Sequence, residues 1–188
     1  MEFFLNIDIK ILLLINGFHN SLFDTIMYSI SQTWLWLPLY ILIIYNIIKL
    51  FGKKGIYIII CAILAIAISD QIASHLIKNL THRLRPSHEP MLANILHIVN
   101  GYRGGEYGFV SSHASNSLAL TAFLYKFFKN RAIYVNYILV AACLLICYSR
   151  IYLGVHYPGD VICGALLGLG VGFVINKIFN KLKLGKFN

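Results

Sequence analysis

Long apolar runs separated by short polar segments make up most of the chain after its first two dozen residues. At about 1.5 Å per residue, a run of about 20 residues forms a helix that crosses the roughly 30 Å hydrocarbon core of a bilayer. The pattern predicts five such helices, over residues 25–48, 55–77, 109–128, 132–148 and 160–179. The expected fold class is therefore all-α: a polytopic transmembrane helical bundle that forms a single membrane-embedded domain over residues 1–188.

The N-terminal segment, residues 1–23, departs from this pattern because its apolar stretch is short. That stretch, Ile11 to Phe18, is interrupted by Asn16 and preceded by Asp8. It is too short to span a bilayer, and the segment lacks the basic start and small-residue cleavage site of a signal peptide. We expect an interfacial helix here, with a tilted sixth span as the alternative.

Composition and charge agree with a membrane protein. Hydrophobic residues make up 59% of the chain and charged residues 12%, which differs strongly from an ordinary soluble domain. The net charge of +9 does not indicate nucleic-acid binding, because the basic residues lie beside apolar runs, where anionic lipid of the bilayer is the expected partner. They occupy two turns and the C-terminal tail: Lys49, Lys53, Lys54, Lys126, Lys129, Arg131, Lys181, Lys183 and Lys186. The positive-inside rule places this face in the cytoplasm.

On the opposite, outer face the predicted topology gathers three polar segments: the loop 78–108, the start of the third span, and residues 149–160. Together they carry three cations, two hydroxyls, two imidazoles and one carboxylate: Lys78, Arg85, Arg150, Ser111, Ser112, His113, His156 and Asp160. Converging cations repel one another unless an anion lies between them, and guanidinium and ammonium groups match the oxygens of a phosphate. The sequence therefore predicts a phosphate site on the outer face, covered by the loop 78–108. Lys78 and Arg85 are seven residues apart, which would place them on one helix face if the helix continued that far.

His156 is the candidate nucleophile of this site. Pro158 suits the first position of the next helix, because its missing N–H costs nothing there, and this places Asp160 in the first helical turn. A carboxylate one turn from an imidazole can accept one ring N–H and raise the basicity of the other nitrogen. His156 could then attack phosphorus while His113 protonates the departing oxygen, and water would hydrolyse the resulting phosphohistidine.

Other polar residues in the spans have less definite roles. Asp70, near the outer end of the second span, is either a residue that supports the site or a plain buried, hydrogen-bonded acid. The four cysteines lie in apolar runs and are expected to be small buried side chains. We expect no cofactor and no metal, since Glu89 and Glu106 are the only outer-loop carboxylates besides Asp160.

The spacing of the site residues resembles the type 2 phosphatidic acid phosphatase family of membrane lipid phosphatases. The resemblance rests on Lys78 with six residues to Arg85-Pro86, on Ser111-Ser112-His113, and on Ser149-Arg150 with five residues to His156 and three more to Asp160. It implies a bundle of about six helices with Lys78, Arg85, Arg150 and Ser111 on phosphate, His113 as general acid, His156 as nucleophile and Asp160 as its partner. The family usually has Pro-Ser-Gly-His where this chain has Val110-Ser111-Ser112-His113, so either serine is a candidate for the phosphate-binding hydroxyl.

The substrate expected from this topology is a lipid phosphate or diphosphate at the outer face of a bacterial inner (plasma) membrane. Undecaprenyl diphosphate ranks first, followed by phosphatidylglycerophosphate, phosphatidic acid and the 1-phosphate of lipid A. A non-hydrolytic lipid or anion transporter and a vanadate-dependent haloperoxidase are the rival functions. Gly164, Gly168 and Gly172 recur at four-residue spacing, which favours close helix packing within the bundle over a homodimer contact, although the oligomeric state stays open.

Overall fold

The computed structural model describes residues 2–182, so the predicted basic residues Lys183 and Lys186 lie outside the described part. Within these residues every regular element is a helix. The principal helices are α1 (Glu2–Gly17), α2 (Ser21–Ile30), α3 (Leu37–Phe51), α4 (Gly55–Asp70), α5 (Lys78–Thr81), α6 (Ser112–Phe128), α7 (Ile133–Tyr152) and α8 (Pro158–Lys181). A π-helix, Gln71–Ile77, joins α4 to α5, and short 3-10 turns lie at Thr33–Trp36, Gly52–Lys54, Pro86–His88, Pro90–Leu92 and Val99–Gly101.

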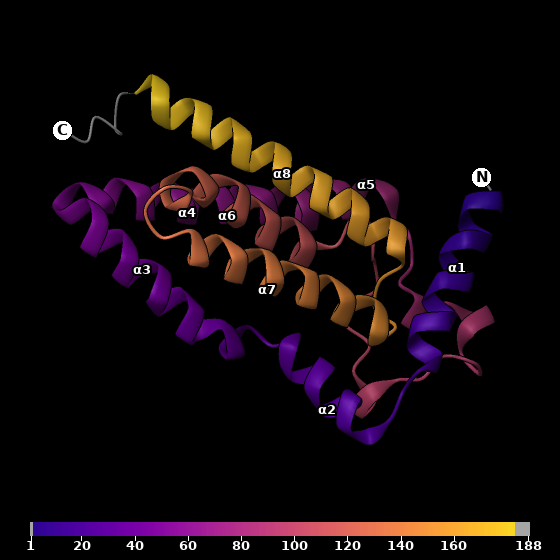
Figure 1. Cartoon of the computed structure of the whole chain (residues 1–188). Helices are drawn as coiled ribbons and strands as arrows, with labels where there is room; N and C mark the ends of the chain where they lie inside the picture. The colour runs from indigo at the N-terminus through magenta and orange to yellow at the C-terminus, as the bar shows by residue number, and fades with distance from the viewer. Residues whose placement is uncertain (1, 183–188) are drawn as a thin grey trace.

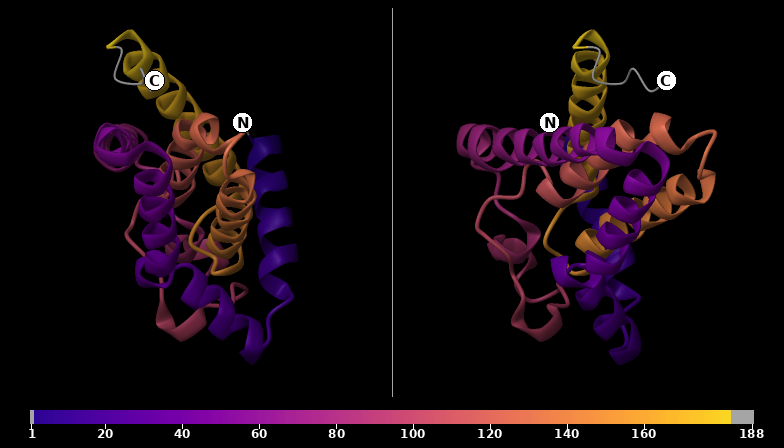
Figure 2. Two further views of the ribbon diagram at one scale, coloured as in Figure 1. Left: turned by 60° about the vertical axis from the view of Figure 1, so that its left-hand side comes forward. Right: turned by 90° about the vertical axis from the view of Figure 1, so that its left-hand side faces the viewer.

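The long helical passes run between the two ends of the molecule (Figure 1). The end at the left of that view holds the α3–α4 and α6–α7 turns and the end of α8, and the other end holds α1, α2 and the loop between α5 and α6. The core between the passes is apolar and includes Ile58, Phe123, Phe128, Val135 and Phe179, each almost fully buried. The left-hand view of Figure 2 shows α1 running alongside α7, which it contacts.

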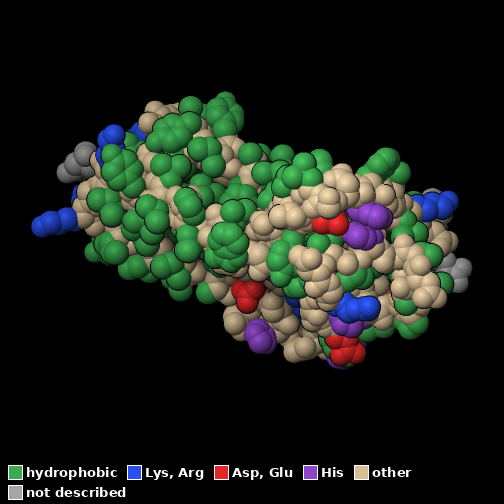
Figure 3. Space-filling view, turned by 90° about the horizontal axis from the view of Figure 1, so that it is seen from below, with side chains coloured by type: hydrophobic (Ala, Val, Ile, Leu, Met, Phe, Trp, Pro, Cys, Tyr) green, Lys and Arg blue, Asp and Glu red, His purple; other side chains and the backbone are tan. Residues whose placement is uncertain are grey.

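Three helical stretches of the described chain are long and apolar enough to cross a membrane: Thr33–Thr81, Ile133–Tyr152 and Pro158–Lys181. The first contains the turn Gly52–Lys54 and so supplies two passes, and the 17-residue α6 supplies the fifth. Large apolar side chains along these helices are exposed, among them Ile41 at 67%, Leu144 at 66% and Phe173 at 66%. Apolar side chains cover much of the long passes in Figure 3, whereas histidine and acidic side chains lie toward the end that carries α1 and α2. Such an apolar surface fits contact with lipid tails.

The predicted first span, residues 25–48, is wrong at its start. Helix α2 ends at Ile30, a 3-10 turn follows, and α3 begins only at Leu37. Pro38 lies in the first turn of α3, where its missing N–H is harmless, whereas a proline deeper in a helix would break it. The indole N–H of Trp36 donates to the carbonyl of Ile30 at 2.8 Å and closes the break.

The second and third spans also differ from the sequence prediction where the outer loop begins and ends. The second continues through Lys78 to Thr81, and His82 then adopts a left-handed conformation with φ of 46°. Lys78 and Arg85 therefore do not share a helix face, because Arg85 lies in extended backbone beyond the helix. The third span begins at Ser112 rather than at Phe109. The last two, α7 and α8, run a few residues past the predicted bounds, and Pro158 is the first residue of α8 as expected.

Helices α6 and α8 pack closely because three glycines of α8 face α6. A Cβ on Gly164 would lie 2.5 Å from the carbonyl oxygen of Ser111, and a Cβ on Gly172 would lie 2.7 Å from the Cβ of Ala122. A Cβ on Gly168 would overlap the carbonyl oxygen of Ser115. The glycine spacing thus serves packing within the bundle, and it brings the start of α6 next to the start of α8.

Helix α1 lies at the outer end of the bundle, against the end of α7 and the start of α8 (Figure 1). Leu12 is fully buried in a small apolar cluster with Leu92 and Leu96 of the outer loop and with Tyr157. The amide of Asn16 donates to the carbonyls of His97 and Tyr152 at 2.9 and 2.7 Å. The N-terminal helix therefore ties the outer loop to the turn between α7 and α8.

Candidate active site

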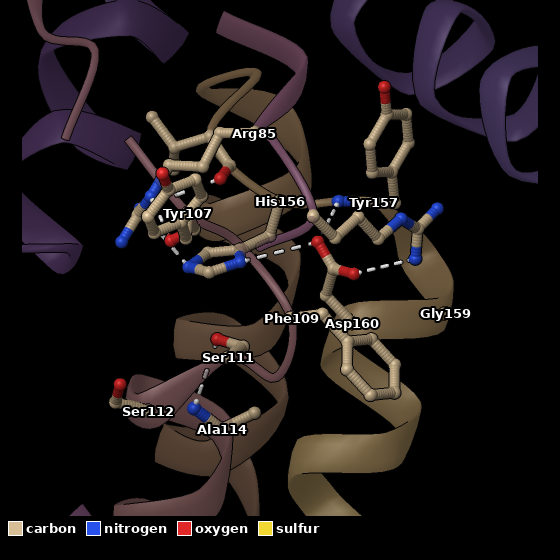
Figure 4. Close-up of polar contacts among 12 residues, drawn as sticks. Arg85, Tyr107, Phe109, Ser111, Ser112, Ala114, His156, Tyr157, Gly159 and Asp160 are labelled. Atoms are coloured by element: carbon tan, nitrogen blue, oxygen red, sulfur yellow. Dashed lines mark hydrogen bonds and ion pairs between the residues drawn. The ribbon is translucent and has the colours of Figure 1, made fainter. Parts of the chain in front are cut away.

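The start of α6, the end of α7, the start of α8 and both ends of the outer loop meet at one place (Figure 4). The loop ends pair with each other, since the N–H of Arg85 donates to the carbonyl of Glu106 at 3.0 Å and that of Gly108 donates to Arg83 at 2.8 Å. The N–H of Ser111 donates to the carbonyl of Asp160 at 3.0 Å, which connects α6 to α8. Side chains from four distant parts of the sequence are therefore fixed around one point.

His156 and Asp160 form the predicted pair at this point. His156 is 1% exposed and Asp160 is fully buried. Imidazole Nδ1 faces carboxylate Oδ2 at 3.5 Å, which is longer than a usual hydrogen bond, and Nδ1 has no hydrogen-bond partner among the described residues. The other ring nitrogen, Nε2, lies 3.2 Å from Nη1 of Arg85 (Figure 4). Because a guanidinium can only donate, Nε2 acts as the acceptor and the proton of a neutral ring belongs on Nδ1.

The three predicted cations gather around His156 without carboxylate partners. In the described chain, none of Lys78, Arg85 and Arg150 lies within 4.0 Å of a carboxylate oxygen. Arg85 donates to the carbonyls of Tyr107 and Val155 at 3.1 and 3.5 Å. Arg85 and Arg150 are buried and Lys78 is half-buried. Cations in such surroundings without a counter-charge are costly, so the arrangement is suited to receiving an anion.

Arg150 is the most deeply buried of these cations, at 1% exposed. One of its terminal nitrogens donates to the hydroxyl of Ser31, and the other donates to Tyr102 at 3.2 Å. Its Nε has no hydrogen-bond partner among the described residues. A buried donor without a partner is unusual in a folded protein and leaves a position where an anion could bind.

The electrostatic consequence is clearest at His156, which lies outside the membrane-spanning helices. Burial lowers the pKa of His156 well below its usual value, and Arg85, Arg150 and Lys78 lower it further. Burial and the neighbouring Arg150 lower the pKa of Arg85 to about 10, so this side chain is still charged at neutral pH. His156 is consequently neutral at neutral pH, which is the form that a nucleophile requires.

The two adjacent serines have different positions. Ser111 is the N-cap of α6, and its hydroxyl accepts from the N–H of Ala114 at 3.5 Å. The hydroxyl of Ser112 accepts from Nζ of Lys78 at 2.7 Å and lies 2.9 Å from that of Ser74. Ser112, unlike Ser111, lines the cavity described next.

A cavity of about 430 Å³ leads from the site into the bundle. Arg85, Ser112 and His113 line its polar end, and Leu39, Leu120 and Leu139 are among the residues of its apolar part. Asp70 also lines the cavity; it accepts from Asn116 at 2.9 Å and from Ser74 at 3.4 Å. Asp70 is therefore connected to Ser112 through Ser74, and its supporting role stays a prediction.

Sequence reasoning did not connect Arg83 with Asp160 or with the N-terminal segment. Its guanidinium contacts Oδ1 of Asp160 at 2.7 Å and Oδ2 of Asp8 at 2.8 Å. The only sequence signal was its position two residues before Arg85, and nothing in the sequence indicated that the N-terminal segment would reach the site. Among the described residues, no three His, Cys, Asp or Glu side chains are grouped so as to hold a metal ion.

Comparison with known proteins identifies the family of this chain. Residues 55–184 match the PAP2 superfamily. The lipid A 4'-phosphatase of Bacteroides thetaiotaomicron is 37% identical over 187 residues, covering 97% of this chain and 81% of the relative. An undecaprenyl-diphosphatase of Bacillus subtilis is 28% identical over 171 residues, covering 88% and 79%.

The fold has a counterpart among solved structures. The phosphatidylglycerolphosphate phosphatase of Bacillus subtilis, a transmembrane PAP2-type enzyme, superimposes with a TM-score of 0.72 over 100% of this chain and 90% of that one, at 23% sequence identity. This likeness concerns the fold, and it confirms the predicted all-helical membrane bundle. The sequence matches place the chain in the PAP2 superfamily, as an integral membrane lipid phosphatase that hydrolyses phosphate esters.

Proposed function

We propose that this enzyme removes the 4'-phosphate of lipid A at the outer face of a bacterial inner membrane, through a phosphohistidine on His156 and without a metal. The observation that carries the proposal is the gathering of Lys78, Arg85 and Arg150, none paired with a carboxylate in the described chain, around a buried neutral histidine. A phosphate monoester supplies the negative charge that this cluster lacks. Its oxygens would accept from the three cations and from Ser112.

In the first chemical step, Nε2 of His156 attacks phosphorus and the bond between phosphorus and the ester oxygen breaks. His113 gives its proton to that oxygen, so that the sugar leaves as an alcohol. Asp160 stabilises the positive charge that develops on the imidazole, because Oδ2 faces Nδ1. The cations stabilise the negative charge on the equatorial oxygens of phosphorus.

In the second step, water attacks phosphorus and the bond between phosphorus and Nε2 breaks. His113, now neutral, takes a proton from the attacking water and returns to its starting form. Inorganic phosphate leaves and His156 becomes neutral again. The step consumes one water molecule, and each histidine ends in the state in which it began.

A lipid substrate is supported by the cavity. Its polar end coincides with Arg85, Ser112 and His113, and its other residues are mostly apolar, so a phosphate and part of an attached hydrocarbon could be accommodated together. The choice of lipid A 4'-phosphate rests on the name of the relative from Bacteroides thetaiotaomicron. Undecaprenyl diphosphate, which ranks first from sequence alone, is the second candidate, because a less similar relative is named an undecaprenyl-diphosphatase.

The proposed orientation of the bundle, with the site at the outer face of the membrane, is supported by the distribution of basic residues. Lys53, Lys54, Lys129 and Arg131 lie in the α3–α4 and α6–α7 turns, at the end of the bundle away from the site. The positive-inside rule puts that end in the cytoplasm and the site at the periplasmic or extracellular surface.

The test is phosphate release by the detergent-purified protein in the presence of EDTA. The substrates are lipid A phosphorylated at both positions, each lipid A monophosphate, undecaprenyl diphosphate, phosphatidylglycerophosphate and phosphatidic acid. We expect release from the 4' position with retention of the 1-phosphate, as read by mass spectrometry. His156→Gln should reduce release to background, and rapid quenching of the wild type in alkali, in which phosphohistidine is stable, should yield phosphate bound to the protein.

His75→Gln is the matched control, because His75 is an exposed histidine that the proposed chemistry does not use. Preferential release from undecaprenyl diphosphate would replace the proposed substrate but keep the mechanism. A folded protein that releases no phosphate from any lipid would instead overturn the mechanism and favour a transporter. Oxidation of halide in the presence of vanadate, without phosphate release, would favour the haloperoxidase alternative.

A further inference from the structure

One arginine that the proposed chemistry does not use joins two carboxylates at the edge of the site. Nη1 of Arg83 lies 2.7 Å from Oδ1 of Asp160, and Nη2 lies 2.8 Å from Oδ2 of Asp8. The guanidinium also stacks over the ring of Tyr157, 4.3 Å from its centroid. The side chains of Arg83, Asp8 and Asp160 are 27%, 16% and 0% exposed, so the bridge is well screened from solvent at its inner end.

The bridge determines how the catalytic carboxylate is turned. Oδ1 of Asp160 is held by Arg83, while Oδ2 accepts from the N–H of Tyr157 at 3.0 Å and faces Nδ1 of His156. With both oxygens fixed, the carboxylate presents Oδ2 to the imidazole. A fully buried carboxylate also needs a nearby positive charge, and in the described chain Arg83 is the only Lys or Arg within 4.0 Å of it.

Asp8 connects this bridge to the N-terminal helix. Besides contacting Arg83, its Oδ1 accepts from the N–H of Gly159, in the first turn of α8, at 2.8 Å. A Cβ on Gly159 would lie 2.8 Å from Oδ2 of Asp8, so the absence of a side chain at that position permits the contact. Helix α1 therefore contacts the same helical turn that carries Asp160.

From these contacts we infer that Arg83 is a positioning residue that orients Asp160 toward His156. Asp8 holds Arg83 in place, and helix α1 thereby belongs to the active site. The inference rests on the proposed function, because it assumes that His156 is the nucleophile. Asp8, Arg83, Asp160 and His156 then form a continuous row from the N-terminal helix to phosphorus. Loss of Arg83 should slow the chemical step while leaving the phosphate-binding cations in place.

The experiment compares kcat, KM and thermal unfolding for Arg83→Gln, Arg83→Lys and Asp8→Asn in the detergent-purified full chain. By analogy with residues that orient other catalytic groups, Arg83→Gln should lower kcat by about 10- to 100-fold with little change in KM. Arg83→Lys keeps the charge next to Asp160 and should recover most of that loss. Arg103→Gln is the control, since Arg103 belongs to the same outer loop but donates to the carbonyl of Ser87.

Two double variants separate positioning from general stabilisation. Asp8→Asn should lower kcat in the wild type but have no further effect in Arg83→Gln, because Asp8 acts through Arg83. Arg83→Gln should likewise have no further effect in Asp160→Asn. The inference would be overturned if Arg83→Gln kept the kcat of the wild type. It would also be overturned if Asp8→Asn lowered kcat equally in the wild type and in Arg83→Gln. A lower melting temperature of Arg83→Gln, together with no recovery of kcat in Arg83→Lys, would also overturn the inference. If the wild type itself released no phosphate, the proposed function would fail instead.

Discussion

Ser112 stands where the type 2 phosphatidic acid phosphatases usually have glycine, and its hydroxyl joins two parts of the site. It accepts from Lys78 at 2.7 Å and lies 2.9 Å from the hydroxyl of Ser74. Glycine at this position could not make either contact. We therefore expect Ser112→Ala to lower kcat/KM for the lipid substrate by about 10- to 100-fold, the range expected for a hydrogen bond to a charged group worth about 1.5–3 kcal/mol.

Ser112→Gly distinguishes the hydroxyl from the backbone. It restores the residue usual in the family but removes the hydroxyl, so its activity should fall as far as that of Ser112→Ala. Ser29→Ala is the control, because that hydroxyl donates to the carbonyl of Thr25 on an exposed helix surface. Full activity of Ser112→Gly in a phosphate-release assay would assign position 112 a backbone role only, and Ser111 would then be the serine to test.

At the scale of single residues, the sequence identified the groups that carry a motif and missed those that act through distant contacts. His156 and Asp160 are four residues apart, so one helical turn was enough to predict that they face each other. Arg83 meets Asp160 across 77 positions and Asp8 across 75. No local spacing encodes such contacts, since they depend on where α1 and the outer loop settle after the bundle has formed.

At the scale of elements, the packing of α6 against α8 sets the distance between His113 on α6 and Asp160 on α8. A Cβ on Gly168 would overlap the backbone of α6, whereas a Cβ on Gly170 of the same helix meets nothing within 4 Å. We expect Gly168→Ala to lower the free energy of unfolding by about 1–3 kcal/mol, as overpacking does elsewhere. It should also reduce phosphatase activity, because α6 carries His113 and α8 carries Asp160.

Gly170→Ala should have the opposite effect on stability. Replacing glycine by alanine in the interior of a helix without a clash stabilises it by about 0.5–1 kcal/mol. Thermal unfolding of both variants in the same detergent, together with phosphate release, measures the contrast. Equal melting temperatures for the two variants would mean that α6 and α8 are not in the tight contact described above.

The helices themselves were predictable to different degrees. Those bounded by lysines or by Pro158 were located to within a few residues, because charge and proline mark the ends of membrane helices. The break after Ile30 was not located, since residues 25–48 are uncharged throughout and no charge marks the change from α2 to a 3-10 turn. The end of the helix at Thr81 was equally hidden, because it depends on the left-handed backbone of His82.

For the whole molecule, the orientation of the helical bundle in the membrane decides which lipids can reach the site. This orientation can be measured directly. Single cysteines at Met91, which is 78% exposed in the outer loop, and at Lys53, which is exposed in the α3–α4 turn, mark the two ends of the bundle. They are placed in a chain whose Cys61, Cys143, Cys147 and Cys163 are replaced by alanine and which still releases phosphate. A membrane-impermeant maleimide added to bacterial spheroplasts should label Met91→Cys at once and Lys53→Cys only after the membrane is opened.

This result follows from the basic turns, because lysine and arginine in short loops are retained on the cytoplasmic side. The same labelling pattern would leave lipid A and undecaprenyl diphosphate of the outer leaflet as accessible substrates. Labelling of Lys53→Cys in intact spheroplasts, with Met91→Cys protected, would place His156 at the cytoplasmic surface. The enzyme would then meet its lipid phosphate in the inner leaflet, and the proposed substrate would have to be one that is present there.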